Sequence, residues 1–389
     1  MSATLKPGTV TATLSLGSLN IKAAAAHATA DVAGAPTDVA AVEQGQPKLE
    51  NFKIAVFSSQ QYVLDFLEAP LEAAFPKNNV KFFESRLKLE SAPLARGFDA
   101  VCAFVNDRIS EAVIQVLAEG GVRFLAMRCA GFDKVDVAAA AKYGLKVVRV
   151  PAYSPRSVAE HALALTFTLA RNLHLTHQRV AAGNYTLSGL VGFELSGKTF
   201  GIVGTGKIGL ALIKLLQGFD CTVLCYDVYK TQEAERLGGR YVSLEELLSQ
   251  ADIVSLHTPL LTETFHLMDQ SRLALMKPTA YLINVSRGGL VNTAALLNAL
   301  QEGRLGGCAM DVYENEGPLF FRDYTRFSPL ERLKNWDRQF EELISLPNVL
   351  ITPHSAFLTN EALSNIAETT ISNLKACAMG EPLINEVRA

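Results

Sequence analysis

Residues 198–216 constrain the fold of this 389-residue chain more than any other stretch. An apolar run ends at Gly204, Gly206 and Gly209 complete a G-x-G-x-x-G pattern, and an amphipathic, helix-like segment follows. In a strand-turn-helix unit, Gly204 would permit the tight turn, Gly206 would let backbone N–H groups approach a pyrophosphate, and Gly209 would allow close packing of helix on strand. Phosphates are favoured at such a helix N-terminus because its N–H groups are unpaired. The stretch therefore predicts a dinucleotide-binding site.

An acidic residue after the next β-like run indicates which dinucleotide binds. Residues 221–226 form this run, and Asp227 lies 18 residues after Gly209, where a carboxylate can accept a hydrogen bond from a ribose 2′-OH. The same charge would repel a 2′-phosphate, so NAD is favoured over NADP as the cofactor. Lys230 is the one nearby residue that would soften this choice. A solvated acid at a strand end is the alternative interpretation of Asp227.

Composition restricts the partners of the chain. Lys plus Arg number 36 and Asp plus Glu number 39, which gives a net charge of −3 without a basic stripe, so no nucleic acid and no anionic membrane is expected as a partner. No apolar stretch approaches the ~20 residues that span a bilayer. The six cysteines contain no C-x-x-C pair and are interpreted as reduced core residues. The partner should be a small molecule.

Residues 1–50 differ in composition from the rest of the chain. Ala, Thr and Ser dominate, and neither helical nor strand periodicity is present, so this segment is predicted to be a disordered leader. It could be a removable organelle transit peptide or an inert tail, and its lack of Arg weakens the first interpretation. A transit peptide would place the protein in an organelle stroma or matrix, with the chloroplast favoured over the mitochondrion. An inert tail would leave it in the cytoplasm.

From residue 53 onward, strand-like and helix-like segments alternate. Strands are predicted at 53–58, 80–84, 99–104, 123–127, 146–150, 252–256, 279–285, 306–311 and 348–352. Helices are predicted at 61–75, 110–119, 134–143, 292–302 and 360–379. A long helix should begin between the two groups of strands, with Ser154 as N-cap and Pro155 in its first turn. The pattern predicts an α/β fold with two doubly wound parallel-sheet domains, Rossmann-like or flavodoxin-like, joined by long hinge helices.

Three side chains are expected near the carboxyl ends of second-domain strands, where open α/β sheets bind their ligands. They are Arg287, Glu316 and His354. A bidentate guanidinium suits the carboxylate of a 2-oxo acid. An imidazolium held charged by a carboxylate suits the protonation of the oxyanion that forms as hydride arrives. Together the three residues predict a carbonyl-reduction site.

Simpler interpretations exist for these and for other polar residues. Arg287 could be an ordinary surface residue, and Glu316 could belong to a solvated acidic loop. His174 and His177, placed on the long helix at i, i+3, could suggest a metal pair, but no Asp, Glu or Cys ligand converges there and no metal is predicted. His257 follows a strand and is expected to line the cofactor rather than to transfer protons.

Six segments resemble motifs of the D-specific 2-hydroxyacid dehydrogenase family, in the same order along the chain from about residue 53 to its end. They are Arg-Cys-Ala-Gly-Phe-Asp at 128–133, Val-Pro-Ala-Tyr-Ser-Pro at 150–155, the glycine turn at 204–209, Asn-Val-Ser-Arg-Gly-Gly at 284–289, Met-Asp-Val-Tyr-Glu-Asn-Glu at 310–316 and Pro-His-Ser-Ala-Phe-Leu-Thr at 353–359. The resemblance implies a discontinuous substrate-binding domain, made of residues 51–152 and 353–389, and a NAD-binding Rossmann domain at 153–352.

The resemblance also implies roles for single residues. Arg287 would bind the substrate carboxylate and keto oxygen, His354 would be the acid/base, and Glu316 would pair with the histidine. The rest of the substrate site would comprise the backbone N–H groups around Ala130 and Gly131 and the hydroxyl of Tyr153. The NAD site would comprise Gly204, Thr205, Gly206, Lys207, Ile208, Gly209, Asp227, His257, Thr258, Pro259, Val285, Asp311 and His354. Within that site, Asp311 would contact the nicotinamide carboxamide.

Residues 317–345 form a long insert that resembles the fermentative D-lactate dehydrogenases of the family. It contains Phe320, Phe321 and the only tryptophan, Trp336. This resemblance implies NADH-dependent reduction of pyruvate to D-lactate by a homodimer or a higher homo-oligomer. Two alternatives stay open. One is a family member that acts on glyoxylate, hydroxypyruvate or a branched 2-oxo acid, and the other is a non-catalytic NADH sensor similar to the family's transcriptional corepressors.

Overall fold

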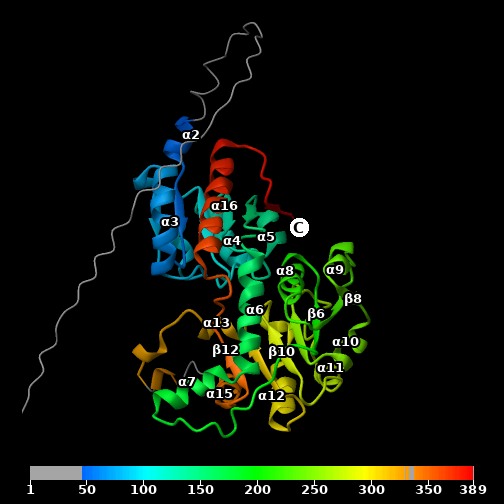
Figure 1. Cartoon of the computed structure of the whole chain (residues 1–389). Coiled ribbons are helices and arrows are strands. Elements are labelled where there is room, and N and C mark those ends of the chain that lie inside the picture. The colour runs from blue at the N-terminus through cyan, green and yellow to red at the C-terminus, as the bar shows by residue number, and fades with distance from the viewer. Residues whose placement is uncertain (1–45, 329, 333–336, 389) are drawn as a thin grey trace, which may run out of the picture. The chain divides into compact units, whose positions relative to one another are not determined.

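A computed structural model describes residues 46–328, 330–332 and 337–388 of the chain (Figure 1). In these residues two β-sheets form, one of six strands and one of seven. Each sheet, together with the helices that pack on it, is called a lobe below. The predicted leader up to residue 45 and Trp336 lie outside the described residues. Among the described helices there is none whose length and apolar character would suit a membrane span.

The first lobe is built mainly from the N-terminal part of the described chain and is completed by its C-terminal end. Its elements are α2 (Gln46–Asn51), β1 (Ile54–Val56), α3 (Gln61–Ala74), η1 (Lys77–Asn79), β2 (Val80–Phe82), η2 (Ala92–Ala95), β3 (Ala100–Ala103), α4 (Glu111–Glu119), β4 (Phe124–Met127), α5 (Val137–Lys142), β5 (Lys146–Arg149), α16 (Asn360–Met379) and β13 (Glu386–Val387). The strand order in its sheet is β13-β5-β4-β3-β1-β2.

The second lobe contains the glycine turn. Its elements are α6 (Pro155–Ala170), α7 (Leu173–Ala181), β6 (Thr199–Val203), α8 (Lys207–Leu216), β7 (Thr222–Tyr226), α9 (Gln232–Arg236), β8 (Gly239–Tyr241), α10 (Leu244–Gln250), β9 (Ile253–Leu256), α11 (Gln270–Leu273), β10 (Tyr281–Asn284), η3 (Gly288–Leu290), α12 (Thr293–Gln301), β11 (Gly307–Met310), α13 (Glu316–Leu319), η4 (Tyr324–Arg326), α15 (Arg338–Ser345) and β12 (Val349–Ile351). The strand order is β12-β11-β10-β9-β6-β7-β8.

Parallel pairing dominates both sheets. Among the described strands, each neighbouring pair is parallel except the pair of β13 with β5, which is antiparallel. Helices connect most successive strands and cover them, so the strands are buried and apolar, as in β9, where all four residues are buried. The prediction of an α/β fold with two doubly wound sheets is therefore confirmed.

The glycine turn has the conformation that its sequence predicts. β6 ends in buried residues, and Gly204 follows with a φ of +100°, a region that residues with a side chain rarely adopt. A Cβ atom at Gly204 would lie 2.7 Å from the carbonyl carbon of His257, and one at Gly209 would overlap the Gly204 oxygen. α8 then begins at Lys207, with Gly206 in the N-cap position. Only glycine fits at Gly204 and Gly209 because strand, helix and neighbouring loop meet there.

The long helix begins as predicted but ends earlier. The Ser154 hydroxyl accepts a hydrogen bond from the Ser157 N–H at 3.2 Å, and Pro155 is the first residue of α6, which packs against α8 and against β10, β11 and β12. After α6 ends at Ala170, Asn172 adopts a φ of +50° and α7 starts in a new direction. His174 and His177 therefore lie on α7, and the expectation that they share the long helix is wrong.

The C-terminal helix returns to the first lobe. α16 packs against α3, α2, β4 and β5, as Figure 1 shows in red beside blue and cyan elements. The Asn373 side chain on this helix donates to the Arg149 carbonyl at 2.9 Å, and β13 then adds an antiparallel edge strand to the sheet. α2 and its Leu49 pack on this lobe, so the prediction that residues 46–50 are disordered is wrong.

Candidate active site

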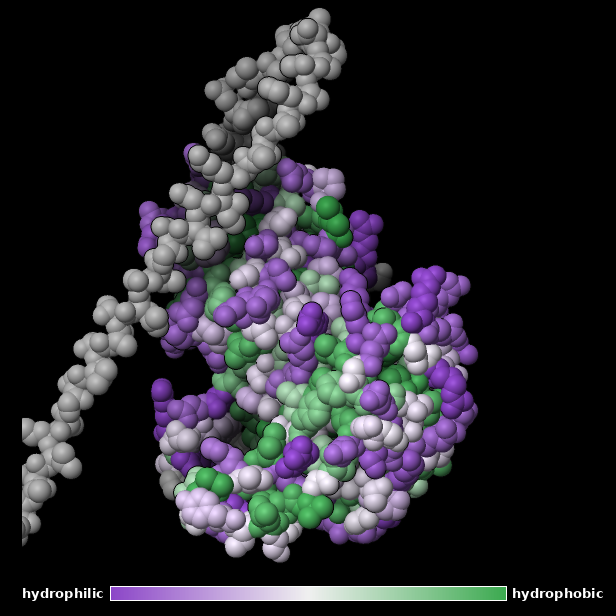
Figure 2. All heavy atoms as spheres, in the orientation of Figure 1, coloured by the Kyte–Doolittle hydropathy of each residue, from purple (hydrophilic) through white to green (hydrophobic). Residues whose placement is uncertain are grey.

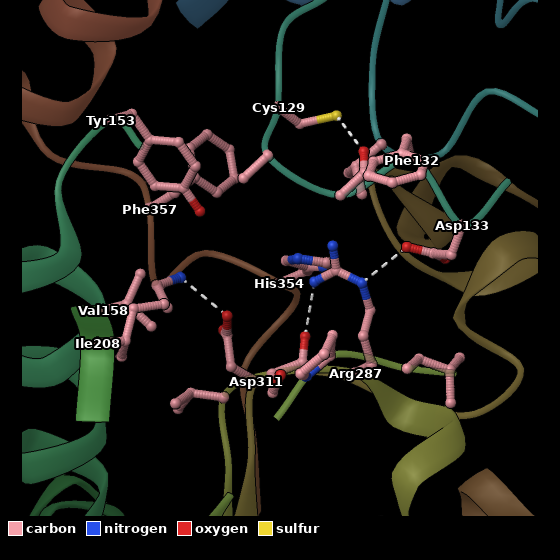
Figure 3. A pocket seen from close by; sticks show the side chains of 18 of the residues that line it. Cys129, Phe132, Asp133, Tyr153, Val158, Ile208, Arg287, Asp311, His354 and Phe357 are labelled. Carbon is pink, nitrogen blue, oxygen red and sulfur yellow. Dashed lines mark hydrogen bonds and ion pairs between the residues drawn. The ribbon is translucent and has the colours of Figure 1, made fainter. Parts of the chain in front are cut away.

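A cavity of about 350 Å³ lies between the two lobes (Figure 3). The loops that follow β3 and β4 line it on the first-lobe side, and the loops that follow β9, β10, β11 and β12 line it on the other. Parallel strands end at one edge of a sheet, so residues far apart in sequence meet there. The predicted site residues that line it are Ala130, Gly131, Tyr153, Ile208, His257, Pro259, Val285, Arg287, Asp311 and His354.

The His354 imidazole is paired with the Glu316 carboxylate. His354 Nδ1 lies 3.2 Å from Glu316 Oε2 and 3.3 Å from Oε1, and Lys134 Nζ lies 3.5 Å from Oε1. Burial alone would raise the pKa of Glu316, but the hydrogen bond and charge of His354 and the charge of Lys134 outweigh burial and lower it to about 2. Glu316 is therefore ionised at neutral pH. Because Nδ1 faces the carboxylate, Nε2 is the ring nitrogen placed to exchange a proton with a substrate.

Asp311 fixes the backbone of the loop that carries His354. Its carboxylate accepts hydrogen bonds from the Thr352 hydroxyl at 2.6 Å and from the Ala356 N–H at 2.9 Å. His354 itself has a φ of +56°, a strained conformation that persists only where the surroundings impose it. Burial would raise the pKa of Asp311, but the hydrogen bond from His161, the charge of His354 and the bond from Thr352 together lower it. Asp311 therefore stays charged and holds the loop.

The Arg287 guanidinium projects into the cavity that His354 also lines (Figure 3). Its Nε donates to Asp133 Oδ1 at 3.0 Å, a bond between the two lobes, and its Nη1 donates to the Ser286 carbonyl at 2.8 Å. Burial disfavours the charge, but Asp133 more than offsets this effect and raises the pKa of Arg287. Nη2 packs directly on Gly131, where a Cβ atom would overlap it. Arg287 is thus a charged, oriented guanidinium, a group that can bind a carboxylate.

Aromatic side chains form another wall of the cavity. The Tyr153 ring packs edge-on against Phe357, with ring centroids 6.3 Å apart, and Phe357 in turn packs against Phe104 at 5.6 Å. Burial raises the pKa of Tyr153 to about 12. Its hydroxyl points into the cavity in Figure 3 and is protonated at neutral pH, so it can donate a hydrogen bond. This wall leaves room for a small apolar group.

The glycine turn borders a neighbouring cavity of about 250 Å³. Gly206 and Lys207 line it, and it shares Tyr153, Ile208 and His257 with the larger cavity, so the two adjoin. The other predicted residues lie outside the lining of these two cavities: Gly204, Thr205, Gly209, Asp227, Thr258 and Glu316.

Asp227 stands at the end of β7, beside the glycine turn. Its Oδ2 accepts from the Thr205 N–H at 2.6 Å, and its Oδ1 accepts from the Tyr229 N–H at 3.0 Å. Thr205 is buried, and its hydroxyl bonds to Tyr241 at 2.7 Å. The carboxylate is therefore tied to the turn that would hold the phosphates.

Known proteins resemble this chain along most of its length. Residues 163–356 match the model of the D-isomer specific 2-hydroxyacid dehydrogenase, NAD binding domain. The chain is 43% identical over 336 residues to the D-lactate dehydrogenase of Escherichia coli, which covers 86% of this chain and 99% of that protein. It is 46% identical over 323 residues to 2-hydroxyacid dehydrogenase homolog 1 of Schizosaccharomyces pombe, and the match covers 83% of this chain and 95% of that protein. The chain belongs to the D-isomer specific 2-hydroxyacid dehydrogenase family.

Solved structures of the same family share the fold. A structure described as the pyruvate reductase of Chlamydomonas reinhardtii superposes with a TM-score of 0.82 at 50% identity, and it covers 87% of this chain and 99% of its own. Membership makes this dehydrogenase an oxidoreductase with a NAD-binding domain and a small 2-hydroxy acid as the class of its substrate. The second lobe, which contains most of the matched residues, is that domain.

The residues of this dehydrogenase fit a dinucleotide. Within the described part of the chain, His257 Nδ1 and the Thr258 hydroxyl are buried without a hydrogen-bond partner, and both follow β9 beside the glycine turn. A Cβ atom at Gly206 would meet no described atom within 4 Å, so space remains over the turn. Burial lowers the pKa of His257 to about 3, which keeps the ring neutral and suits a cofactor contact better than proton transfer.

Three contacts of this family member go beyond the roles that its motifs predict. Asp133 orients Arg287, Lys134 supports Glu316, and Asp311 holds the catalytic loop. Asp133 ends the 128–133 motif and Lys134 follows it, so the sequence places both residues after a predicted strand but does not indicate their partners. No described group of three or more His, Cys, Asp or Glu side chains could hold a metal ion, and His174 instead bonds to the Pro347 carbonyl at 2.9 Å.

Proposed function

We propose that this dehydrogenase reduces pyruvate to D-lactate with NADH as the cofactor. The observation that carries the proposal is that Arg287 and His354 line one cavity, the first oriented by Asp133 and the second paired with Glu316. A 2-oxo acid presents a carboxylate next to a carbonyl, and these two side chains match those groups. The names of the Escherichia coli and Chlamydomonas relatives, a D-lactate dehydrogenase and a pyruvate reductase, support pyruvate as the substrate.

The substrate carboxylate would bind to Arg287, with the N–H groups near Gly131 and the Tyr153 hydroxyl as further donors. These groups line the cavity together, and Arg287 is fixed before a substrate arrives, so little reorganisation is needed. The methyl group of pyruvate would face apolar wall residues such as Phe104 and Phe357. A small 2-oxo acid therefore suits this cavity better than one with a charged tail.

Proton transfer would belong to His354. When bound, NADH would supply the hydride for the carbonyl carbon. His354 would donate the proton from Nε2 to the carbonyl oxygen, and the ionised Glu316 would stabilise the imidazolium beforehand. Arg287 would stabilise the negative charge that develops on the oxygen. Because the cavity has walls from both lobes, their contact would exclude water during the reaction.

NAD is favoured over NADP by the position of Asp227. Its carboxylate is anchored to the glycine turn through Thr205, so a 2′-phosphate in that place would meet a fixed negative charge. Lys230 does not compensate in this arrangement, since its ammonium lies over the Tyr241 ring, 5.8 Å from the centroid. The expected selectivity is for NADH.

A panel of 2-oxo acids tests the proposal. Pyruvate, glyoxylate, hydroxypyruvate and 2-oxoisocaproate would each be assayed with NADH and with NADPH, and the chirality of the product would be determined. The full chain would be compared with a form that begins at Gln46 and keeps α2. The highest kcat/KM should be obtained with pyruvate and NADH, with D-lactate as the product.

Other outcomes of the panel identify the alternatives. A higher kcat/KM for another 2-oxo acid would reject pyruvate but keep the reaction class. NADH binding without turnover of any acid would favour a sensor similar to the family's corepressors. A preference for NADPH would refute the role given to Asp227.

We infer that the protein assembles as a homodimer through an apolar face on α7 and the loop after it. Leu173, Val180, Tyr185, Leu187 and Val191 are between 48% and 91% exposed there. In Figure 2 green side chains gather along the lower edge of the view, where this segment runs in Figure 1. Monomers rarely expose so many large apolar side chains together, and a second copy would cover them.

Light scattering on the double variant Leu187→Glu and Val191→Glu tests the dimer. Both side chains are solvent-exposed, at 80% and 91%, so the fold should persist while the mass falls to that of a monomer. Ile384→Glu, at a residue that is 94% exposed on the first lobe, is the matched control and should keep the wild-type mass. An unchanged mass in the double variant would exclude this face.

A further inference from the structure

A second polar cavity, of about 320 Å³, lies behind the aromatic wall of the catalytic cavity. Phe104 is the one residue that lines both, and Phe321 packs edge-on against it with ring centroids 5.8 Å apart. The loops after β1, β2 and β3 and the first turn of α3 supply most of its lining, and the insert after α13 supplies Phe321 and Arg322. It is therefore a separate site between the two lobes.

Positive charge dominates the lining of this cavity. Arg86, Lys88 and Arg322 line it, together with the carboxylate of Glu84. Lys88 is paired with Glu90 at 3.5 Å, so the two guanidinium groups carry the positive charge of the lining. The Arg86 guanidinium donates to the backbone carbonyls of Gly317 and, at 2.6 Å, Phe320, which do not neutralise its charge.

The charged form of Arg86, the more buried of the two arginines, is disfavoured by its surroundings. Burial and the charge of Arg322 lower the pKa of Arg86, although Asp107 and Glu316 act in the opposite direction. Two guanidinium groups in one cavity therefore repel each other, and an anion between them would relieve the repulsion.

An unsatisfied donor points to the same kind of ligand. Asn106 lines the cavity and is 8% exposed, and its Oδ1 accepts from Lys134 Nζ at 3.2 Å. In the part of the chain that the structure describes, nothing accepts a hydrogen bond from its Nδ2. A buried amide N–H without an acceptor is costly, and each such group in a native protein calls for a partner. A ligand with acceptor oxygens would satisfy it.

We propose that this cavity binds a small anion whose carboxylate or phosphate oxygens accept hydrogen bonds from Asn106 and from the guanidinium groups of Arg86 and Arg322. Because Lys88 is paired with Glu90, two guanidinium groups face the one carboxylate of Glu84, and the remaining positive charge favours an anion. Arg guanidinium groups are the preferred receptors for both kinds of oxyanion.

The bound anion would stabilise the contact between the lobes. Arg86 belongs to the first lobe, whereas Arg322 follows α13, the helix that begins with Glu316. Anion binding would therefore favour the arrangement in which Glu316 meets Lys134 and His354. By linkage, it should tighten pyruvate binding, and pyruvate should tighten anion binding by the same factor. This consequence rests on the proposed function, whereas binding of the anion does not.

Calorimetric titration of the full chain with inorganic phosphate and with succinate tests the site, at an ionic strength held constant with chloride. The wild type should bind at least one probe at a single site. Arg322→Ala and Asn106→Leu should each weaken binding by about tenfold, the effect of losing one charge-assisted or buried hydrogen bond. Tighter binding of phosphate would indicate a phosphorylated ligand, and tighter binding of succinate would indicate a dicarboxylate.

Arg326→Ala is the matched control. Arg326 lies in the same insert, is 84% exposed and pairs with Asp323 at 2.8 Å, outside the cavity lining, so this variant should bind like the wild type. Failure of the wild type to bind either probe, or wild-type affinity in Arg322→Ala, would overturn the proposal. The proposal would also be overturned if Arg287→Ala lost binding while Arg322→Ala and Asn106→Leu kept it, because the anion would then occupy the catalytic cavity. The titrations need no turnover, so they are independent of the reductase assay.

Discussion

Gly131→Ala is the substitution whose effect follows most directly from the geometry of the site. Gly131 packs on the Arg287 guanidinium, and a Cβ atom at this position would overlap Nη2 and lie 2.8 Å from Cζ. It would also lie 3.1 Å from Asp133 Oδ1, the acceptor that orients Arg287. The three atoms nearest to the added methyl group thus belong to Arg287 and to the residue that orients it, so the guanidinium is the group that it displaces.

The size of the displacement sets the expected loss of activity. Carbon atoms that are not bonded approach to about 3.5–4.0 Å, so Cζ must retreat by roughly 1 Å, and Nη2, which the Cβ atom would overlap, must retreat farther. Misplacement of a catalytic group by about 1 Å costs on the order of 10²-fold in rate. We expect kcat/KM for pyruvate to fall about 10²-fold, which corresponds to roughly 2.7 kcal/mol of transition-state stabilisation. Thermal stability should change little, because the far end of a flexible side chain can move.

Steady-state assays of pyruvate reduction measure this loss. Gly218→Ala is the matched control, because a Cβ atom there would have no described atom within 4 Å, and it should behave like the wild type. A double-mutant cycle shows whether Arg287 transmits the effect: in an Arg287→Ala background, Gly131→Ala should cause almost no further loss. A Gly131→Ala variant that keeps nearly full kcat/KM would refute the position assigned to Arg287.

Three further predictions follow from the same site. Arg287→Ala should lower kcat/KM for pyruvate by at least about 10²–10³-fold, the usual effect of removing a preorganised donor, and near-normal activity would reject its role. His354→Ala should lose activity but keep its affinity for NADH in a fluorescence titration; loss of NADH binding would make the histidine structural. The pKa of Glu316 is about 2 in the folded protein, against an ordinary 4.5. Its ionised form therefore stabilises the fold by at most roughly 3 kcal/mol above pH 4.5, and this contribution is lost as the pH falls toward 2. Urea unfolding should therefore show a shallower loss of stability over that range in Glu316→Gln, and identical pH profiles would contradict the pairing.

The sequence predicts most of the fold because local patterns and burial agree. Most strands of the two sheets and the N-cap of α6 follow from residue spacing alone. The apolar spacing does not indicate the break between α6 and α7, although Asn172, a residue type that tolerates positive φ, stands at the break. β13 has only two residues, and its antiparallel pairing with β5 depends on a partner more than 200 positions away. A pattern search within a short window cannot detect such a strand.

The site could be predicted to the extent that it depends on strand ends. Arg287 and His354 follow β10 and β12, so the topology of the second sheet brings them together. Contacts between the lobes cannot be predicted in this way, because they depend on how the two lobes pack against each other. Asp133 bonds to Arg287 across 154 positions, and Lys134 reaches Glu316 across 182. Neither partner is indicated by residue spacing in the sequence.

These contacts give the two lobes a shared role in the proposed chemistry. The second lobe supplies both reacting side chains, Arg287 and His354, yet each is positioned with help from the first lobe, through Asp133 and through Lys134 beside Glu316. If the lobes separated, Arg287 would lose its orienting carboxylate and Glu316 would lose a charge that favours its ionised form. Catalytic competence would therefore depend on lobe contact, since the same contact orients the anion receptor, supports the proton donor and excludes water.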